Sequence, residues 1–150
     1  MRTLATIGYE SATVPRFLET LREARVELLV DVRAVASSRR PGFAKTALAA
    51  NLKEAGIDYL HLRRLGTPAD GRAAARAGRH EEMHAIFREH LATEEAQEEL
   101  HTLAQLVRDR RVCIMCFEHD PAHCHRSIVA SALGALEPIR VTHLDPSDAD

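Results

Sequence analysis

The sequence predicts an α/β fold, a three-layer α/β/α sandwich around a mostly parallel sheet of about five strands. Short apolar runs bounded by turn residues alternate with segments whose apolar residues recur at helical spacing. Strands separated by helices pair in parallel through right-handed crossovers, which place helices on the faces of the sheet. The length of 150 residues and the ordinary composition, 45% apolar and 28% charged, favour a single domain over residues 1–150.

The first elements are a strand, a helix and a second strand. The apolar run Leu4–Ile7 ends at Gly8 and predicts the first strand. Thr13 can cap a helix, because apolar residues follow it at i, i+3, i+4 and i+7 spacing. These residues are Val14, Phe17, Leu18 and Leu21. The β-branched and apolar run Leu28–Val32 predicts the second strand.

A second helix and a third strand follow. Lys45–Ala55 carries Leu48 and Leu52 on one face and precedes Gly56, a residue preferred just past a helix C-terminus. Ile57–Leu62 predicts the third strand. The segment Pro68–His80 is rich in Ala, Arg and Gly, and its pattern leaves a loop and a weak helix both open.

Two further helices lead to the fourth strand. Glu81–Leu91 places its large apolar residues on one helical stripe. Thr93 can cap the next helix, whose first turn is acidic, as suits the helix dipole. The fourth strand is expected at 111–116, a helix at 127–136 and an edge strand at 139–143. The acidic tail from Asp145 is expected to fray, and the spacing does not fix the strand order.

Charge and cysteine content exclude some classes of protein. The formal net charge of −2 gives no overall basic field for nucleic acid, although residues 33–53 hold five cations and no acid. Five arginines also fall between Arg63 and Arg79. Three cysteines, an odd number, argue against a disulfide framework. No signal peptide or membrane span is evident, so we expect a cytoplasmic protein without a membrane partner.

The stretch 112–126 is the most informative part of the sequence. An apolar run there ends abruptly in thiols, a carboxylate, histidines and an arginine. Ligands of open α/β sheets bind at the carboxyl ends of the strands, and parallel strands bring those ends to one edge. We therefore expect one polar edge that collects Glu10, Arg33, Arg40, Cys116, Glu118, Cys124, His125 and Arg126.

Arginines and a helix start at this edge predict an anion site. Arg33 follows a buried strand and requires a carboxylate or a bound anion. A structural pair with Asp31, Glu10 or Glu118 is the alternative to a ligand role. The start of the last long helix favours an anion through its free N–H groups and Arg126. The residues expected to bind the substrate or anion are Tyr9, Arg33, Ser38, Arg40, His125 and Arg126.

Candidate catalytic groups are two carboxylates and two thiols. Glu10 and Glu118 could divide acid and base work if their environments separate their pKa values, or they could merely neutralise arginines. Cys124, before a helix and beside His125, is a candidate nucleophile, and Cys116 is its rival.

A zinc site is disfavoured, and no metal ligand is assigned. Cys113 and Cys116 should face opposite sides of the sheet, and Cys113 reads as a buried apolar residue. The sequence does not predict whether a cofactor is bound.

The chain resembles the bacterial and archaeal family called domain of unknown function 488, over about residues 3–135. The resemblance is carried by Thr6–Glu10, Leu29–Arg33, Ser37–Lys45, Gly56–Leu62 with Leu65 and Gly66, and Cys116–Glu118 with Cys124–Arg126. The resemblance implies a small, cytosolic α/β protein and supplies no activity. Its recurrent polar positions fall on Gly8, Tyr9, Glu10, Asp31, Arg33, Ser38, Glu118, Cys124, His125 and Arg126. Ala36 stands where many relatives have proline.

Three functional hypotheses remain at the level of the sequence. The leading one is an enzyme, a hydrolase or transferase with Glu or Cys chemistry, acting on a phosphate-bearing or otherwise anionic substrate, including a nucleotide or a nucleic-acid end. The second is a non-catalytic nucleotide or nucleic-acid binder, motivated by the basic segments. The third is a thiol redox or metal-dependent protein that depends on Cys116, Cys124 and His125. The oligomeric state is not predicted.

Overall fold

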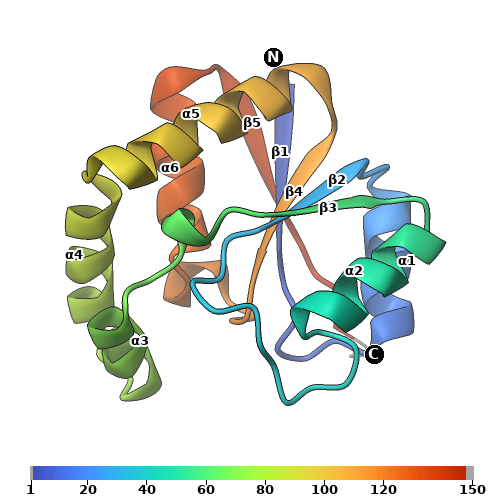
Figure 1. Cartoon of the computed structure of the whole chain (residues 1–150), viewed down its shortest axis with the longest axis horizontal. Helices are drawn as coiled ribbons and strands as arrows, with labels where there is room; N and C mark the ends of the chain where they lie inside the picture. The colour runs from blue at the N-terminus through green and yellow to red at the C-terminus, as the bar shows by residue number, and fades with distance from the viewer. Residues whose placement is uncertain (1, 148–150) are drawn as a thin grey trace.

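A single five-stranded parallel sheet organises the protein. The computed structural model describes residues 2–147, and its strands lie in the order β3-β2-β4-β1-β5 (Figure 1). The strands are β1 (Arg2–Gly8), β2 (Leu28–Asp31), β3 (Asp58–His61), β4 (Val112–Cys116) and β5 (Ile139–Leu144). All four pairings between neighbours are parallel. The predicted α/β/α sandwich, its parallel sheet and the edge position of the last strand are confirmed.

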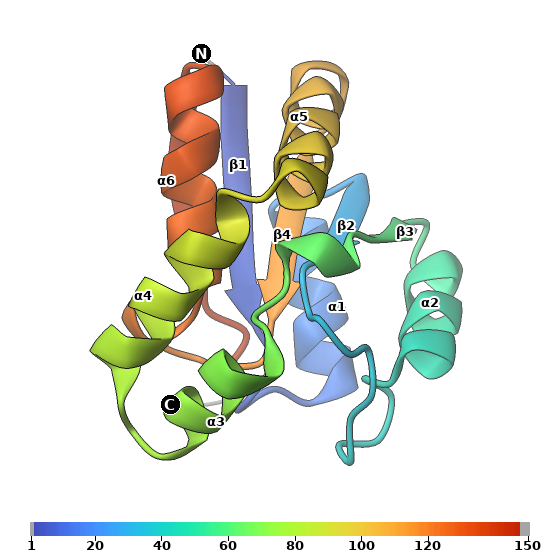
Figure 2. The ribbon, with the colours of Figure 1, turned by 60° about the vertical axis from the view of Figure 1, so that its left-hand side comes forward.

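Helices cover both faces of the sheet, as the views in Figures 1 and 2 show. Helices α1 and α2 lie on one face, and α3 to α6 lie on the other. The helices are α1 (Val14–Glu23), α2 (Lys45–Glu54), α3 (Ala69–Arg76), α4 (His80–Leu91), α5 (Glu94–Asp109) and α6 (Arg126–Leu136). Short 3₁₀ turns occupy Arg63–Leu65 and Pro121–His123. Among the described residues, no helix is long and apolar enough to cross a membrane.

Local signals in the sequence account for most helix boundaries. Thr13 and Thr93 each accept a hydrogen bond from a backbone N–H of the first turn, so both predicted N-caps are confirmed. Gly56 follows α2 with a φ of 77°, a conformation that favours glycine. The open question at Pro68–His80 is answered by α3, which packs against α4 through small residues including Gly71 and Ala74.

The sheet separates two apolar clusters. On the face of α1 and α2, Phe17, Leu21 and Leu52 pack against Ile7 and other side chains of the sheet. On the opposite face, α4, α5 and α6 cover alternate side chains of the same strands. Cys113 belongs to the first cluster and Cys116 to the second, as the alternation of side chains along a strand predicts.

The strand order creates a crevice at the carboxyl end of β4. Strand β4 lies between β1 and β2, and the helices that follow β1 and β2 cover one face. The helix that follows β4 covers the other face. Chain segments therefore diverge to opposite faces around β4, which is the arrangement that opens ligand sites in α/β sheets. The tail expected to fray from Asp145 falls partly on residues 148–150, which lie outside the described residues.

Candidate functional site

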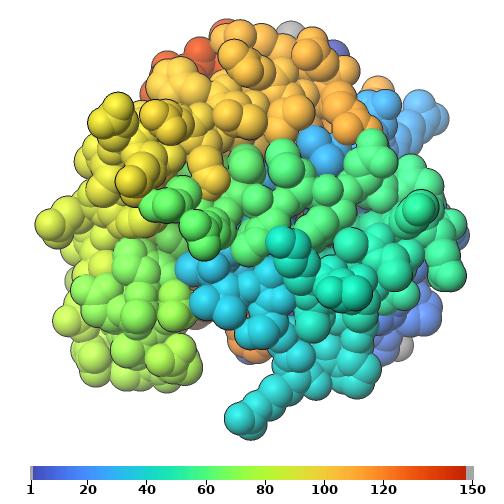
Figure 3. Space-filling view, viewed as in Figure 1, coloured from blue at the N-terminus to red at the C-terminus, as the bar shows by residue number. Residues whose placement is uncertain are grey.

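A cavity of about 350 Å³ opens at the carboxyl ends of β1, β2 and β4. Its walls come from Tyr9 after β1, from residues 33–39 after β2, from residues 116–118 at the end of β4, and from α3. Figure 3 shows the surface hollowed between α3, in light green, and the loop after β2, in blue. The volume lies within the range of small-molecule sites.

Two glycines allow the backbone segments of this edge to approach one another. A Cβ atom on Gly8 would lie 1.8 Å from the carbonyl oxygen of Glu118. A Cβ atom on Gly66 would lie 2.1 Å from the backbone nitrogen of Ala34. Any side chain at either position would collide with backbone, so only glycine allows these segments to lie so close together.

Arg33 is a structural cation, paired with Asp31 in the core of the edge. Its Nε and Nη2 atoms donate to the two carboxylate oxygens of Asp31 at 2.9 and 2.7 Å. Its Nη1 atom donates to the Tyr9 hydroxyl at 3.2 Å and to the Phe43 carbonyl at 2.8 Å. Four of its five N–H groups are thus used by the protein, which favours the structural pair considered above over a ligand role.

The carboxylate of Asp31 is satisfied in turn by its neighbours. It is fully buried and also accepts hydrogen bonds from the backbone N–H of Arg33 at 3.0 Å and the Tyr59 hydroxyl at 2.6 Å. Burial disfavours the charged form of Arg33, but the hydrogen bonds and charge of Asp31 outweigh it and raise the guanidinium pKa. Burial and the same carboxylate raise the pKa of Tyr59.

Arg126 is also buried, but no carboxylate pairs with it among residues 2–147. Its guanidinium donates to the Thr6 hydroxyl at 3.2 Å and to the carbonyls of Glu118 and His119 at 2.6 and 3.1 Å. Its Nη1 atom also lies 3.2 Å from the Cys116 Sγ atom. Burial lowers the pKa of Arg126, because nearby acids only partly offset the loss of solvent.

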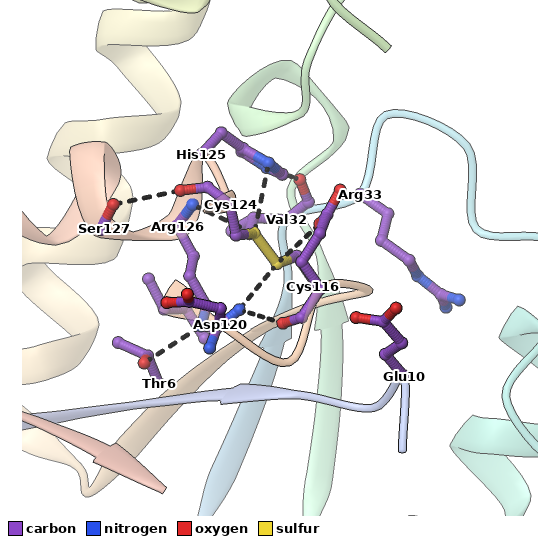
Figure 4. The surroundings of a disulfide bond; sticks show 12 residues. Thr6, Glu10, Val32, Arg33, Cys116, Asp120, Cys124, His125, Arg126 and Ser127 are labelled. Carbon is purple, nitrogen blue, oxygen red and sulfur yellow. Dashed lines mark hydrogen bonds between the residues drawn. A yellow bond between two sulfur atoms is a disulfide. The ribbon is translucent and has the colours of Figure 1, made fainter. Parts of the chain in front are cut away.

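Cys116 and Cys124 are joined by a disulfide, shown with its surroundings in Figure 4. The odd number of cysteines argued against a disulfide framework, and it did not predict this single bond, which leaves Cys113 free. The loop 117–123 folds back so that the start of α6 meets the end of β4. The backbone N–H of Arg126 donates to Cys124 Sγ at 3.5 Å. In Figure 4 the Arg126 side chain points toward the sulfurs, whereas the Arg33 guanidinium points away from them.

His125 is neutral at neutral pH and has a defined tautomer. Burial lowers its pKa to about 4. Its Nε2 atom lies 2.7 Å from the Val32 carbonyl oxygen, which can only accept, so Nε2 carries the proton. The Nδ1 lone pair then faces Cys124 Sγ at 3.7 Å. The ring therefore places a hydrogen-bond acceptor beside a sulfur and contributes to one wall of the cavity.

Glu118 lies between the main cavity and a smaller neighbouring one. It lines both, and the second, of about 250 Å³, also contains Glu10, His80 and His123. Burial raises the pKa of Glu118, and the charge of Glu10 raises it further. The Glu10 carboxylate accepts the backbone N–H of His119 at 3.0 Å, and it lies outside the main cavity.

Of the other two predicted binding residues, Ser38 lines the main cavity and Arg40 does not. Ser38 lines the main cavity, and its Oγ atom accepts the backbone N–H of Arg40 at 3.1 Å. Arg40 does not line the cavity, because its guanidinium bonds to the Ala12 carbonyl and stacks over the Phe43 ring.

Three arginines that were not singled out do line the main cavity, namely Arg39, Arg72 and Arg76. All three belong to the basic segments noted in the sequence. Arg72 donates to the Thr67 carbonyl at 2.9 Å. Within residues 2–147, Arg39 and Arg76 make no side-chain hydrogen bond or ion pair. Their charges are therefore available at the mouth of the cavity.

One group of donor atoms has the spacing that a soft metal ion needs. The sulfurs of Cys116 and Cys124 and a ring nitrogen of His125 lie within 4.8 Å of one another. A disulfide uses both sulfurs, so metal binding and the observed bond exclude each other. Elsewhere in residues 2–147 no comparable cluster of His, Cys, Asp and Glu side chains is found.

A comparison with models of known protein families identifies the family of this chain. The family model described as "Domain of unknown function DUF488" matches residues 13–133, well over half of the sequence. The chain belongs to this family. The part that matches the DUF488 model includes both buried arginines and both bonded cysteines, and it begins after Tyr9 and Glu10. No curated protein and no solved structure matches the chain.

Proposed function

We propose that this DUF488 protein is an enzyme that binds an organic anion, of the phosphate-bearing class, in the main cavity. The observation that carries the proposal is the pair Arg39 and Arg76, which line one cavity at the carboxyl edge of the sheet. Both are exposed, and neither has a side-chain hydrogen bond or ion pair among residues 2–147. Guanidinium groups bind phosphate and carboxylate oxygens with paired, charge-assisted hydrogen bonds. The hydroxyl groups of Ser37, Ser38 and Thr67 on the same walls suit the same ligand.

The cavity also has an apolar side, which supports an organic anion over an inorganic one. Val35 and Phe117 are 54% and 42% exposed, and both line the cavity. The Phe117 ring meets the Tyr9 ring edge-on, with centroids 5.3 Å apart. An exposed aromatic face beside two cations fits a ring that bears a phosphate, as a nucleotide does.

Glu118 is proposed as the group that moves a proton. Its raised pKa increases the fraction of the carboxyl that is protonated near neutral pH, and its place in the cavity wall puts it within reach of a bound ligand. Arg33 and Arg126 are proposed to shape the site and not to hold the anion, since most of their N–H groups are already used. The cytoplasmic location expected from the sequence remains part of this proposal.

Binding measurements with adenosine monophosphate and inorganic phosphate test the proposal. We expect R39A and R76A each to weaken nucleotide binding about tenfold, the loss of one or two hydrogen bonds to a charged group. The matched control is R79A, in the same basic stretch, because Arg79 pairs with Glu82 and does not line the cavity. We expect F117A to weaken nucleotide binding and to leave inorganic phosphate unaffected.

The outcomes are distinct. Equal affinity in R39A, R76A and R79A would refute the anion site. Binding of a 5′-phosphorylated oligonucleotide that weakens steeply with salt, with no detectable affinity for the mononucleotide, would favour the nucleic-acid binder instead. An E118Q variant that binds the ligand as tightly as the parent and turns it over at the same rate would exclude Glu118 as the proton donor.

A further inference from the structure

Within residues 2–147, Arg126 has no carboxylate in contact with its guanidinium, although it is a buried cation. The residue is fully buried, and among residues 2–147 its partners are a hydroxyl, two carbonyls and a sulfur. A buried charge is normally paired with an opposite charge. The nearest atom that could carry a negative charge in contact with it is Cys116 Sγ, at 3.2 Å, once the disulfide is reduced.

The second sulfur has a different set of neighbours. Cys124 Sγ accepts the backbone N–H of Arg126 and faces the Nδ1 lone pair of His125 at 3.7 Å. Both cysteines are buried, at 1% exposure for Cys116 and 0% for Cys124, but only Cys116 lines the cavity. Cys116 Sγ also lies 3.6 Å from Oε2 of Glu118. One sulfur thus borders the cavity beside a cation, and the other lies away from the cavity beside a neutral imidazole. This division of roles is typical of an attacking and a resolving cysteine.

We propose that Cys116 and Cys124 form a reversible dithiol–disulfide pair, in which Cys116 is the attacking thiolate held by Arg126 and Cys124 is the resolving thiol, which lies beside His125. The proposal does not depend on an anion in the cavity. It adds a redox-active site to the cavity wall, with a low-molecular-weight disulfide as the oxidant and a dithiol as the reductant.

The exchange balances in two steps. The Cys116 thiolate attacks one sulfur of glutathione disulfide, forms a mixed disulfide and releases one glutathione thiolate. The Cys124 thiol attacks the Cys116 sulfur, passes its proton to the departing sulfur and releases the second glutathione. The two leaving thiolates take up the two protons that the protein thiols lost. The protein loses two electrons, glutathione disulfide gains them, and dithiothreitol reverses the change.

Thiol counting and mass spectrometry test the pair directly. Protein reduced with dithiothreitol should show three thiols after denaturation. Treatment with glutathione disulfide should lower the count to one, and mass spectrometry should find Cys116 and Cys124 in a disulfide-linked peptide. The matched control is C113A, which should lose the same two thiols, because Cys113 lies alone on the other face of the sheet. Persistence of three thiols would overturn the proposal, as would one equivalent of zinc that protects Cys116 and Cys124 from oxidation.

The role of Arg126 has its own test in a C113A/C124A background, where only Cys116 remains. We expect R126M to slow alkylation of Cys116 by iodoacetamide about tenfold at neutral pH, since the thiolate loses its cation. R126K should restore part of the rate. An unchanged rate in folded R126M would overturn the assignment of Arg126. If R126M does not fold, the R126K rate and the thiol count still decide, because neither depends on that variant.

Discussion

The protein buries two arginines at the same edge of its sheet and compensates their charges in different ways. Arg33 is paired with Asp31 through two side-chain hydrogen bonds, and Tyr59 and the backbone complete the set of donors to that carboxylate. Arg126 is enclosed by carbonyls, a hydroxyl and a sulfur, without an ion pair inside the described range. The first arginine belongs to a closed network, and the second leaves a charge partly uncompensated.

The difference indicates where chemistry can occur. A cation with a dedicated carboxylate fixes the position of nearby loops, here those that carry Tyr9 and Phe43. A cation that is hydrogen-bonded to dipoles and has no paired carboxylate still attracts negative charge, and it stabilises an anion that forms beside it. Functional groups often sit where such charge is left over, so the Arg126 side of the edge is the better candidate for reactivity.

The largest effect is expected from removing the carboxylate of the closed network. D31N leaves Arg33 buried without an anion, which should cost about 3–5 kcal/mol of unfolding free energy. Denaturant unfolding at neutral pH measures this loss. D58N is the matched control, because Asp58 lies on the neighbouring strand β3 and pairs with Arg110 at 2.6 Å but is 71% exposed. That exposed pair should contribute less than about 1 kcal/mol. Similar losses of unfolding free energy in D31N and D58N would show that the buried pair contributes no more than the exposed one.

The sequence predicted the fold well because its signals are local. Apolar runs that end at turn residues marked the strands, and threonine caps marked α1 and α5. The segment of α3 was harder to assign, because its buried residues include Gly71 and Ala74. Such small side chains give little apolar periodicity, and this helix depends on packing against α4.

The site was only partly predictable, because it depends on contacts between distant segments. Parallel strands were enough to predict one polar edge. The choice of Asp31 as the partner of Arg33 depended on local folding, and the contribution of Tyr59 depended on the strand order. The link between Cys116 and Cys124 depends on the path of a loop, which no local pattern encodes. Arg76 faces the cavity only because α3 is a helix in that place.

The side of the edge that holds Arg126 should also be the side whose stability is lost in acid, because His125 lies there. The pKa of His125 is about 4 in the folded protein, against an ordinary value of 6.5 that we take for the unfolded chain. Burial is the main cause of the decrease, and the charge of Arg126 adds to it. As the pH falls from 6.5 toward 4, the unfolded chain binds a proton that the folded protein does not. Stability should therefore fall over this range, by about 3 kcal/mol, and the contribution should level off below pH 4.

Unfolding free energies of the parent and H125Q between pH 4 and pH 7.5 check this expectation. Because His84 and His143 also have lowered pKa values, the difference between the two proteins isolates the contribution of His125. The groups that face this ring are Asp31, His90 and Arg126. A constant difference across the pH range would show that the ring is not held neutral by the folded protein, and the contrast between the two arginines would lose its second support.

The smallest of these effects should come from a methyl group placed against the carbonyl that serves Arg126. In G8A the new Cβ atom would meet the Glu118 carbonyl oxygen at 1.8 Å and Nη1 of Arg126 at 3.0 Å. The carbonyl must move, which should cost about 1–3 kcal/mol as in other overpacked sites. G134A in α6 is the control, since the nearest neighbour of its new Cβ atom would be 3.9 Å away and alanine favours the helix.

In G8A, the displacement of the Glu118 carbonyl would also weaken the 2.6 Å hydrogen bond that it accepts from Arg126. G8A should therefore change the alkylation rate of reduced Cys116, whereas G134A should not. A G8A variant as stable as the parent, with the same rate, would mean that the carbonyl does not help to hold this cation in place.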